Sequence, residues 1–175
     1  HHYRYLVVSR ERTRQFDPIQ SVDVATASDQ TVHLQRVVSD DGSEVRLYCH
    51  SEARQEKETA MTDRFSQTFE AGMAKLAAGL LKPRGEKNRD KLLQRIGRLQ
   101  EKSHGIGRHY QIELTPAEGP VVNGITWTKE PIDGTQLTHP GVYCLRTNEL
   151  RWDAAALWQT YTQLTDLEAV FRSLK

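Results

Sequence analysis

The sequence has few of the features that mark secreted or membrane proteins. Its 175 residues include only two cysteines, Cys49 and Cys144, which fall in separate strand-like segments. No framework of disulfides is therefore expected, and a reduced compartment is favoured. No run of 18 apolar residues occurs, and the apolar run near the N-terminus is too short for a signal peptide. These absences predict a cytoplasmic protein with no membrane partner.

The common catalytic and cofactor motifs are also missing. The segment from Gly79 to Lys87 has its glycines one residue too far apart for a phosphate loop, and it joins two predicted helices. Gly105-Ile106-Gly107 precedes a predicted strand, which is the wrong order for a dinucleotide site. His104 and His109 are five residues apart, which is no recognised zinc spacing.

Acidic and basic residues almost balance, but the basic ones are unevenly distributed. The formal net charge is +1. Between Lys82 and Arg108, nine basic residues stand against three acidic ones. One interpretation is an ordinary solvated helix surface, and the other is a surface that contacts nucleic-acid phosphates. The second interpretation assigns DNA binding to four residues of one predicted helix: Lys91, Arg95, Arg98 and Lys102.

The hydrophobic pattern predicts an α+β fold. A nearly continuous apolar strand at Tyr5–Ser9 is typical of a sheet interior. Alternating apolar and polar residues between Ser21 and His50 predict a three-stranded antiparallel meander, and a helical hairpin follows from Ser51 to Lys102. The remaining predicted elements are strands at Arg108–Thr115, Gly124–Lys129 and Gly141–Thr147, and a final helix at Asp153–Lys175.

The final helix carries the most informative spacing in the sequence. Tyr161, Glu168 and Lys175 lie seven residues apart, so their side chains fall on one stripe of the helix. A second stripe is apolar and is expected to be buried: Leu157, Leu164, Leu167, Phe171 and Leu174. The plain alternative is an amphipathic helix on which Glu168 forms an i,i+4 pair with Arg172.

Read from Tyr161, the helix has the spacing Tyr161-x2-Leu164-x3-Glu168-x6-Lys175. This resembles the signature Tyr-x2-Arg-x3-Glu-x6-Lys of the DDE transposases of the insertion-sequence-4 type. The segments GVYCLRTN before the helix and LTDLEAVFRSLK within it are also similar to that family. Leu164 departs from the signature, since the family has arginine there. The resemblance is specific over roughly residues 141–175 and covers the rest of the chain in layout only.

The resemblance implies a bacterial protein that acts on double-stranded DNA at transposon ends, as a homodimer in the full-length synaptic complex. Such enzymes have a ribonuclease-H-like fold in which two Asp and one Glu hold two Mg²⁺ or Mn²⁺ ions. Glu168 would be that Glu and a metal ligand, and Lys175 and Tyr161 would contact DNA phosphates. Residues 1–10 and 141–175 would belong to a partial ribonuclease-H-like core, and residues 11–140 would form a β-rich insertion with the helical hairpin.

Two features leave alternatives open. In the family both catalytic Asp lie upstream of a strand like that at Tyr5–Ser9, and here no Asp precedes it. We therefore expect the chain to be the C-terminal part of a transposase catalytic domain, inactive by itself and without bound metal. The alternative functions are a DNA-binding or dimerisation module without chemistry, and a decayed or domesticated relic. Trp127 is interpreted either as a core residue or as an aromatic that stacks on a flipped DNA base.

Overall fold

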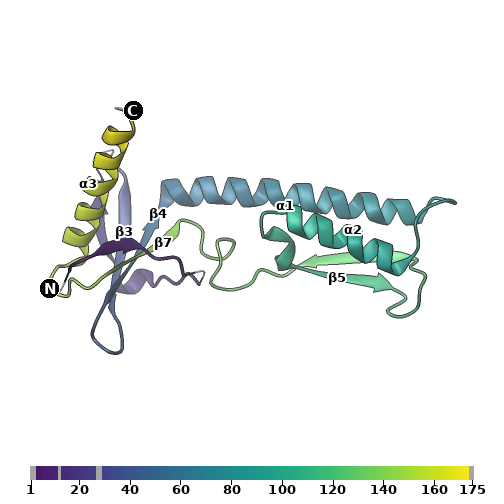
Figure 1. Cartoon of the computed structure of the whole chain (residues 1–175), viewed down its shortest axis with the longest axis horizontal. Helices are drawn as coiled ribbons and strands as arrows, with labels where there is room; N and C mark the ends of the chain where they lie inside the picture. The colour runs from purple at the N-terminus through teal and green to yellow at the C-terminus, as the bar shows by residue number, and fades with distance from the viewer. Residues whose placement is uncertain (1–2, 12, 27–28, 174–175) are drawn as a thin grey trace. The chain divides into compact units, whose positions relative to one another are not determined.

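The computed structural model describes residues 3–11, 13–26 and 29–173, which adopt an α+β fold (Figure 1). These residues form two compact units. Unit 1 comprises the described residues up to Glu58 and from Gly134 onward, and unit 2 is Thr59–Asp133. The meander lies in unit 1, and the helical hairpin lies in unit 2 from Thr59 onward. The segment 11–140 is thus divided between the two units.

Unit 1 is built on a five-stranded antiparallel sheet with the strand order β1-β7-β4-β3-β2. The predicted meander is confirmed, since β2 pairs with β3 and β3 with β4. Side chains alternate between the faces, and Val32, Leu34 and Leu47 belong to the core that also contains Leu157 and Trp158 of the final helix, α3 (Ala154–Ser173). The strands are β1 (Leu6–Val8), β2 (Val22–Ala25), β3 (Thr31–Val38), β4 (Val45–Ser51) and β7 (Val142–Thr147).

The first strand is at the edge of this sheet, not in its interior as its apolar sequence predicts. Among the described residues, strand β1 pairs with β7 alone, in the register Val7↔Arg146. Val7 and Val8 are therefore about half exposed, at 48% and 50%. Composition alone did not reveal this, because a three-residue apolar run suits an interior strand and an uncovered edge strand equally well.

Helix α3 (Ala154–Ser173) is buried only along its first turns. Asp153 caps it as predicted, because its Oδ1 accepts a hydrogen bond from the Ala156 N–H at 2.7 Å. Leu157 and Trp158 pack against the sheet. The predicted apolar stripe fails beyond that point, since three of its members are exposed and Leu174 lies outside the described residues. The exposed members are Leu164 at 47%, Leu167 at 55% and Phe171 at 66%.

Unit 2 packs two helices against a separate two-stranded sheet (Figure 1). The hairpin is confirmed as α1 (Glu52–Leu80) and α2 (Arg89–Lys102). Helix α2 begins three residues later than predicted because the Asn88 side chain caps it, accepting from the Lys91 N–H at 3.1 Å. The 3-10 helix η2 (Ile106–His109) then leads into the antiparallel strands β5 (Tyr110–Thr115) and β6 (Gly124–Lys129).

A glycine sets the contact between the two helices of unit 2. A Cβ on Gly72 of α1 would lie 2.8 Å from Cδ2 of Leu99 on α2. A larger side chain at position 72 would therefore require the Leu99 side chain to move. The close contact lets the core residues Phe69 and Met73 of α1 and Ile96 of α2 pack into one cluster with Tyr110.

A buried carboxylate joins three distant segments of unit 1. Oε2 of Glu58, in α1, accepts from Nη1 of Arg14 at 2.6 Å and from the backbone N–H of Gly141 at 2.9 Å. Its Oε1 accepts from Nε of Arg54 at 2.9 Å. Burial raises the pKa of the Glu58 carboxyl, but the hydrogen bonds from Arg14, Gly141 and Arg54 outweigh it, so the pKa is lowered.

We expect Glu58→Gln to lower the free energy of unfolding by about 3 kcal/mol at pH 7, because it leaves two guanidinium groups without their carboxylate. The folded-state pKa of Glu58 is depressed. Its contribution is thus present above the unfolded carboxyl pKa and is lost as the pH falls through the folded-state pKa. Urea unfolding at pH 7 and below pH 4 measures this, and the gap between variant and wild type should close at the acid pH.

The control is Glu56→Gln, which makes the same change at an exposed position of α1. It should leave the unfolding free energy within about 0.5 kcal/mol of wild type. Equal effects of the two substitutions at pH 7 would contradict the role assigned to Glu58.

Candidate nucleic-acid interface

Helix α3 brings Tyr161 and Glu168 onto one side of a continuous helix but places them in different surroundings. The Tyr161 ring packs against the unit 1 core, with its centroid 6.2 Å from that of Tyr143. The Glu168 side chain is 71% exposed, and its Oε2 lies 3.5 Å from Nη2 of Arg172. This is the i,i+4 pair of a plain amphipathic helix, and solvent screens it. Lys175 lies outside the described residues.

The surroundings of Glu168 do not form a metal site by themselves. Among the described residues, no group of three or more His, Cys, Asp or Glu side chains is arranged to hold a metal ion. A two-metal centre needs several carboxylates around the ions, and the one partner seen for Glu168 is a cation, Arg172. The described residues therefore do not by themselves supply the ligands of a two-metal centre.

The four predicted DNA-binding residues of α2 lie on one line along the helix. Lys91, Arg95, Arg98 and Lys102 follow each other at intervals of four, three and four residues, and all four are exposed. Leu92 and Ile96 are buried on another side of the helix. Lys91 pairs with Glu86 at 3.2 Å. In the part of the chain that the structure describes, no carboxylate lies within ion-pair distance of the other three.

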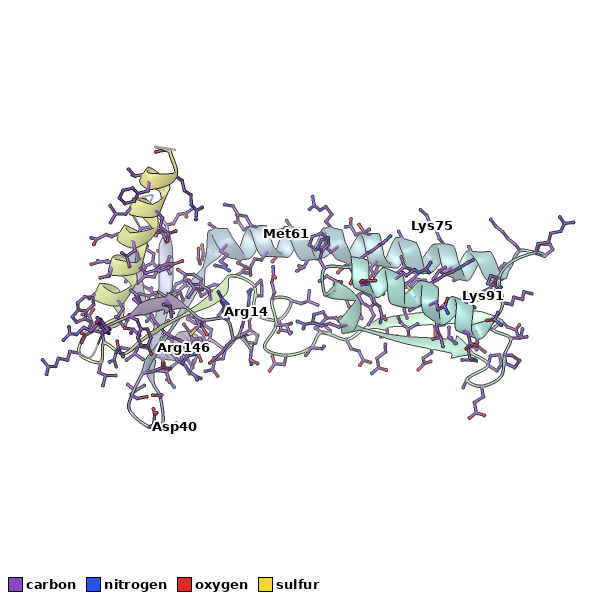
Figure 2. The ribbon with its side chains drawn as sticks, viewed as in Figure 1. Arg14, Asp40, Met61, Lys75, Lys91 and Arg146 are labelled. Carbon is purple, nitrogen blue, oxygen red and sulfur yellow. The ribbon has the colours of Figure 1, made fainter. Side chains whose placement is uncertain are left out.

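Helix α1 adds two basic residues that sequence reasoning missed. Arg64 and Lys75 are exposed and lie eleven residues apart, which is about three turns, so they share one line of α1. Arg64 lines the same hollow as Lys102, so the two lines come together at that hollow. Figure 2 shows Lys75 on α1 and Lys91 on α2. We call these six residues the basic surface: Arg64, Lys75, Lys91, Arg95, Arg98 and Lys102.

Trp127 contributes to the packing of unit 2. It lies on β6 opposite Ile112 of β5 and packs, partly buried, against the core of unit 2. The indole therefore belongs to the packing around the core of unit 2. Of the two interpretations of this residue, the contacts favour the core one.

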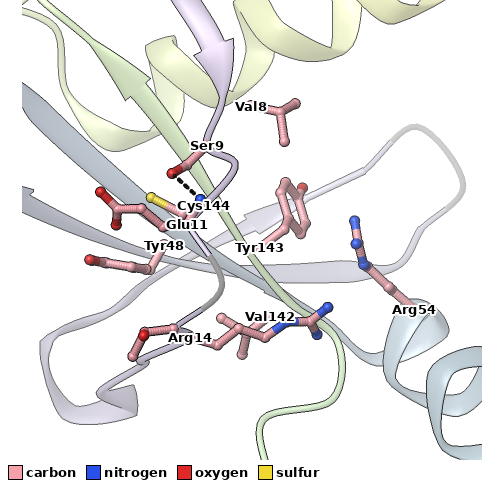
Figure 3. Close-up of a pocket in the computed structure, with 10 residues that line it drawn as sticks. Val8, Ser9, Glu11, Arg14, Tyr48, Arg54, Val142, Tyr143 and Cys144 are labelled. Carbon is pink, nitrogen blue, oxygen red and sulfur yellow. Dashed lines mark hydrogen bonds between the residues drawn. The ribbon is translucent and has the colours of Figure 1, made fainter. Parts of the chain in front are cut away.

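A small cavity in unit 1 offers a second place where chemistry could occur (Figure 3). It has a volume of about 110 Å³ and is lined by Cys144, Tyr143, Arg14 and Arg54, among others. Both guanidinium groups are already engaged by Glu58. Burial, followed by the nearby Glu11 carboxylate, raises the pKa of the Cys144 thiol to about 11. The thiol is therefore protonated at neutral pH and is no nucleophile.

Comparison of the chain with protein-family models, with curated proteins and with solved structures finds no match. The described helices include none with both the length and the apolar character to cross a bilayer.

If the basic surface binds DNA, neutralising two of its central charges should weaken binding in a salt-dependent way. We expect the variant Arg95→Gln/Arg98→Gln to bind a 30-base-pair duplex more weakly than wild type. The slope of log K against log salt concentration should decrease by about 1.8, or 0.9 for each DNA phosphate that the protein no longer neutralises. Fluorescence anisotropy titrations from 50 to 300 mM KCl measure both quantities.

The matched control is Arg10→Gln/Lys57→Gln, which removes the same net charge from exposed positions in unit 1. It should keep the wild-type slope. If the two double variants changed the slope equally, the effect would come from net charge and not from the basic surface.

Proposed function

We propose that the chain is part of a transposase of the DDE type that cuts and joins DNA at the ends of a mobile element. One observation carries the proposal: the spacing of Tyr161, Glu168 and Lys175, with the similar segments that surround it in residues 141–175. In this proposal Glu168 is the glutamate of the catalytic triad. Two aspartates from another segment complete the site, and unit 1 belongs to a ribonuclease-H-like domain.

The position of Glu168 on α3 supports this assignment. Glu168 and Tyr161 share one side of a continuous helix whose first turns are fixed against the sheet by Leu157 and Trp158. A rigid helix that is anchored at one end gives a carboxylate further along it a fixed direction. Because the Glu168 carboxylate is exposed, it is accessible to carboxylates from another segment.

The uncovered apolar surface of α3 supports the same proposal. Leu164, Leu167 and Phe171 are about half or more exposed next to Glu168 on the helix. Exposed neighbouring apolar side chains commonly mark an interface. Strand β1 is an edge strand with exposed Val7 and Val8, so further strands could add to the sheet there. A segment that carries the two aspartates would cover both features.

A DNA-binding module without chemistry is the second candidate, and a specific observation favours it. The basic surface lies entirely in unit 2, whereas Glu168 lies in unit 1. Residues spaced along one helix face can follow a phosphate backbone without any catalytic group. The two candidates differ in one respect, which is whether Glu168 is needed for strand cleavage.

The test is made on the polypeptide that the complete gene encodes. We expect Glu168→Gln to reduce Mn²⁺-dependent cleavage at the element's ends by at least about 100-fold, because a neutral amide binds divalent metal poorly. DNA affinity should stay within about twofold of wild type, since the basic surface is unchanged. Cleavage is measured on end-labelled duplexes in gels, and affinity by anisotropy.

The control Asp166→Asn removes a carboxylate two residues away on the same exposed part of α3 and should cleave normally. Full cleavage by Glu168→Gln would rule out the transposase proposal and leave the binding module. The 175-residue chain alone should not nick DNA, because one glutamate cannot hold two metal ions. Metal-dependent nicking by the purified chain would contradict the assignment of the missing carboxylates to another segment.

A further inference from the structure

Two histidines lie side by side on the face of the unit 1 sheet that is opposite α3. In the ladder between β3 and β4, His33 is the direct partner of His50. Their neighbours Leu34 and Cys49 belong to the core that includes α3, and successive side chains of a strand point to opposite faces. Both imidazoles therefore lie on the other face of the sheet, with ring centroids 5.7 Å apart.

Each imidazole is oriented by a hydrogen bond at one of its two nitrogens. Nδ1 of His33 lies 2.6 Å from Oδ1 of Asp23, and Nε2 of His50 lies 2.7 Å from Oε1 of Gln55. Both oxygens are acceptors, so these two nitrogens carry the ring hydrogens of the neutral imidazoles. The other two, Nε2 of His33 and Nδ1 of His50, then keep their lone pairs. Among the described residues, neither of them has a hydrogen-bond partner.

A hollow of about 790 Å³ is lined by both rings and lies entirely within unit 1. Phe16 also lines it, and its ring centroid is 5.4 Å from that of His50. Of the described residues that line the hollow, Asp23 is the one with a formal charge, and that charge is negative. The hollow therefore gives a small cation access to the two imidazoles without a competing positive charge.

We propose that His33 and His50 bind one divalent transition-metal ion of the class that imidazole nitrogen suits, namely Cu²⁺, Ni²⁺ or Zn²⁺. Bonds from a metal to imidazole nitrogen are about 2.0–2.1 Å long, so two rings on one ion have centroids roughly 5–6 Å apart. The observed separation of 5.7 Å lies in that range. Water fills the remaining coordination positions. Asp23 fixes the tautomer of His33, as carboxylates do for many metal-bound histidines.

This site differs from the metal centre of the proposed transposase in both place and chemistry. Carboxylate oxygens suit Mg²⁺ and Mn²⁺, whereas imidazole nitrogens suit Cu²⁺, Ni²⁺ and Zn²⁺. Helix α3, which carries Glu168, packs on the opposite face of the sheet. The inference therefore does not depend on the proposed function, and an ion bound here joins β3 to β4 by a second link besides their backbone hydrogen bonds.

The test is isothermal titration calorimetry of the metal-free 175-residue chain with NiCl₂ at neutral pH. Wild type should bind Ni²⁺ tightly, and an excess of Mg²⁺ should not compete. His33→Gln/His50→Gln removes both ligands and should abolish the tight site. Asp23→Asn should weaken binding about 10-fold or more, because it removes the group that orients His33. Bound Cu²⁺ should show two coordinated imidazole nitrogens by electron paramagnetic resonance, and one in His50→Gln.

Two controls separate this site from other histidines of the chain. His104→Asn removes an exposed imidazole from unit 2 and should bind Ni²⁺ as wild type does. His1→Ala/His2→Ala should also bind as wild type does, which excludes capture of the ion by the adjacent histidines at the N-terminus. Circular dichroism establishes that each variant is folded.

Three outcomes would overturn the site. They are failure of wild type to bind Ni²⁺, equal affinity of wild type and His33→Gln/His50→Gln, and loss of all binding in His1→Ala/His2→Ala. If the double variant of the ligands does not fold, Asp23→Asn decides, because the Asp23 side chain is 67% exposed and its replacement leaves the packing intact. An unchanged affinity in Asp23→Asn would then count against the site.

Discussion

The buried carboxylate of Glu58 is the interaction on which unit 1 depends. It accepts hydrogen bonds from Arg14, from Arg54 and from the backbone of Gly141, three groups that are far apart in the sequence. A buried charge is tolerated only when its hydrogen bonds are satisfied, so these segments must come together for Glu58 to be buried. Gly141 directly precedes β7, which pairs with both β1 and β4. The carboxylate thus fixes the start of β7, the strand that lies between the edge strand β1 and the central strand β4.

The parts of the fold that the sequence predicted are those determined by local patterns. Alternation indicated the meander, and the pattern between Ser51 and Lys102 indicated the helical hairpin. These patterns can be recognised in the sequence because each strand or helix has one face against a core. The first residues of the helices were predicted less accurately. For α2, the Asn88 side-chain cap decides where the helix begins.

The parts that sequence reasoning missed depend on contacts between distant residues. Nothing in the sequence Leu6–Val8 says whether one neighbour or two will pair with it. The apolar stripe on α3 predicts a buried side, but burial requires a surface to pack against. The structure leaves Leu164 exposed. At the candidate site, the four residues of α2 could be found from their spacing. Arg64 was overlooked because its relation to Lys102 arises only when the two helices pack.

The contact between Gly72 and Leu99 has a consequence for the basic surface. At this contact the Leu99 side chain lies against the backbone of Gly72, so the distance between the charges of α1 and those of α2 is set by packing and not by the charges themselves. Mutual repulsion among six cations would otherwise push the helices apart. The hydrophobic core of unit 2 therefore has to outweigh this repulsion while the surface is unoccupied, and a polyanion that neutralises the surface would remove the repulsion.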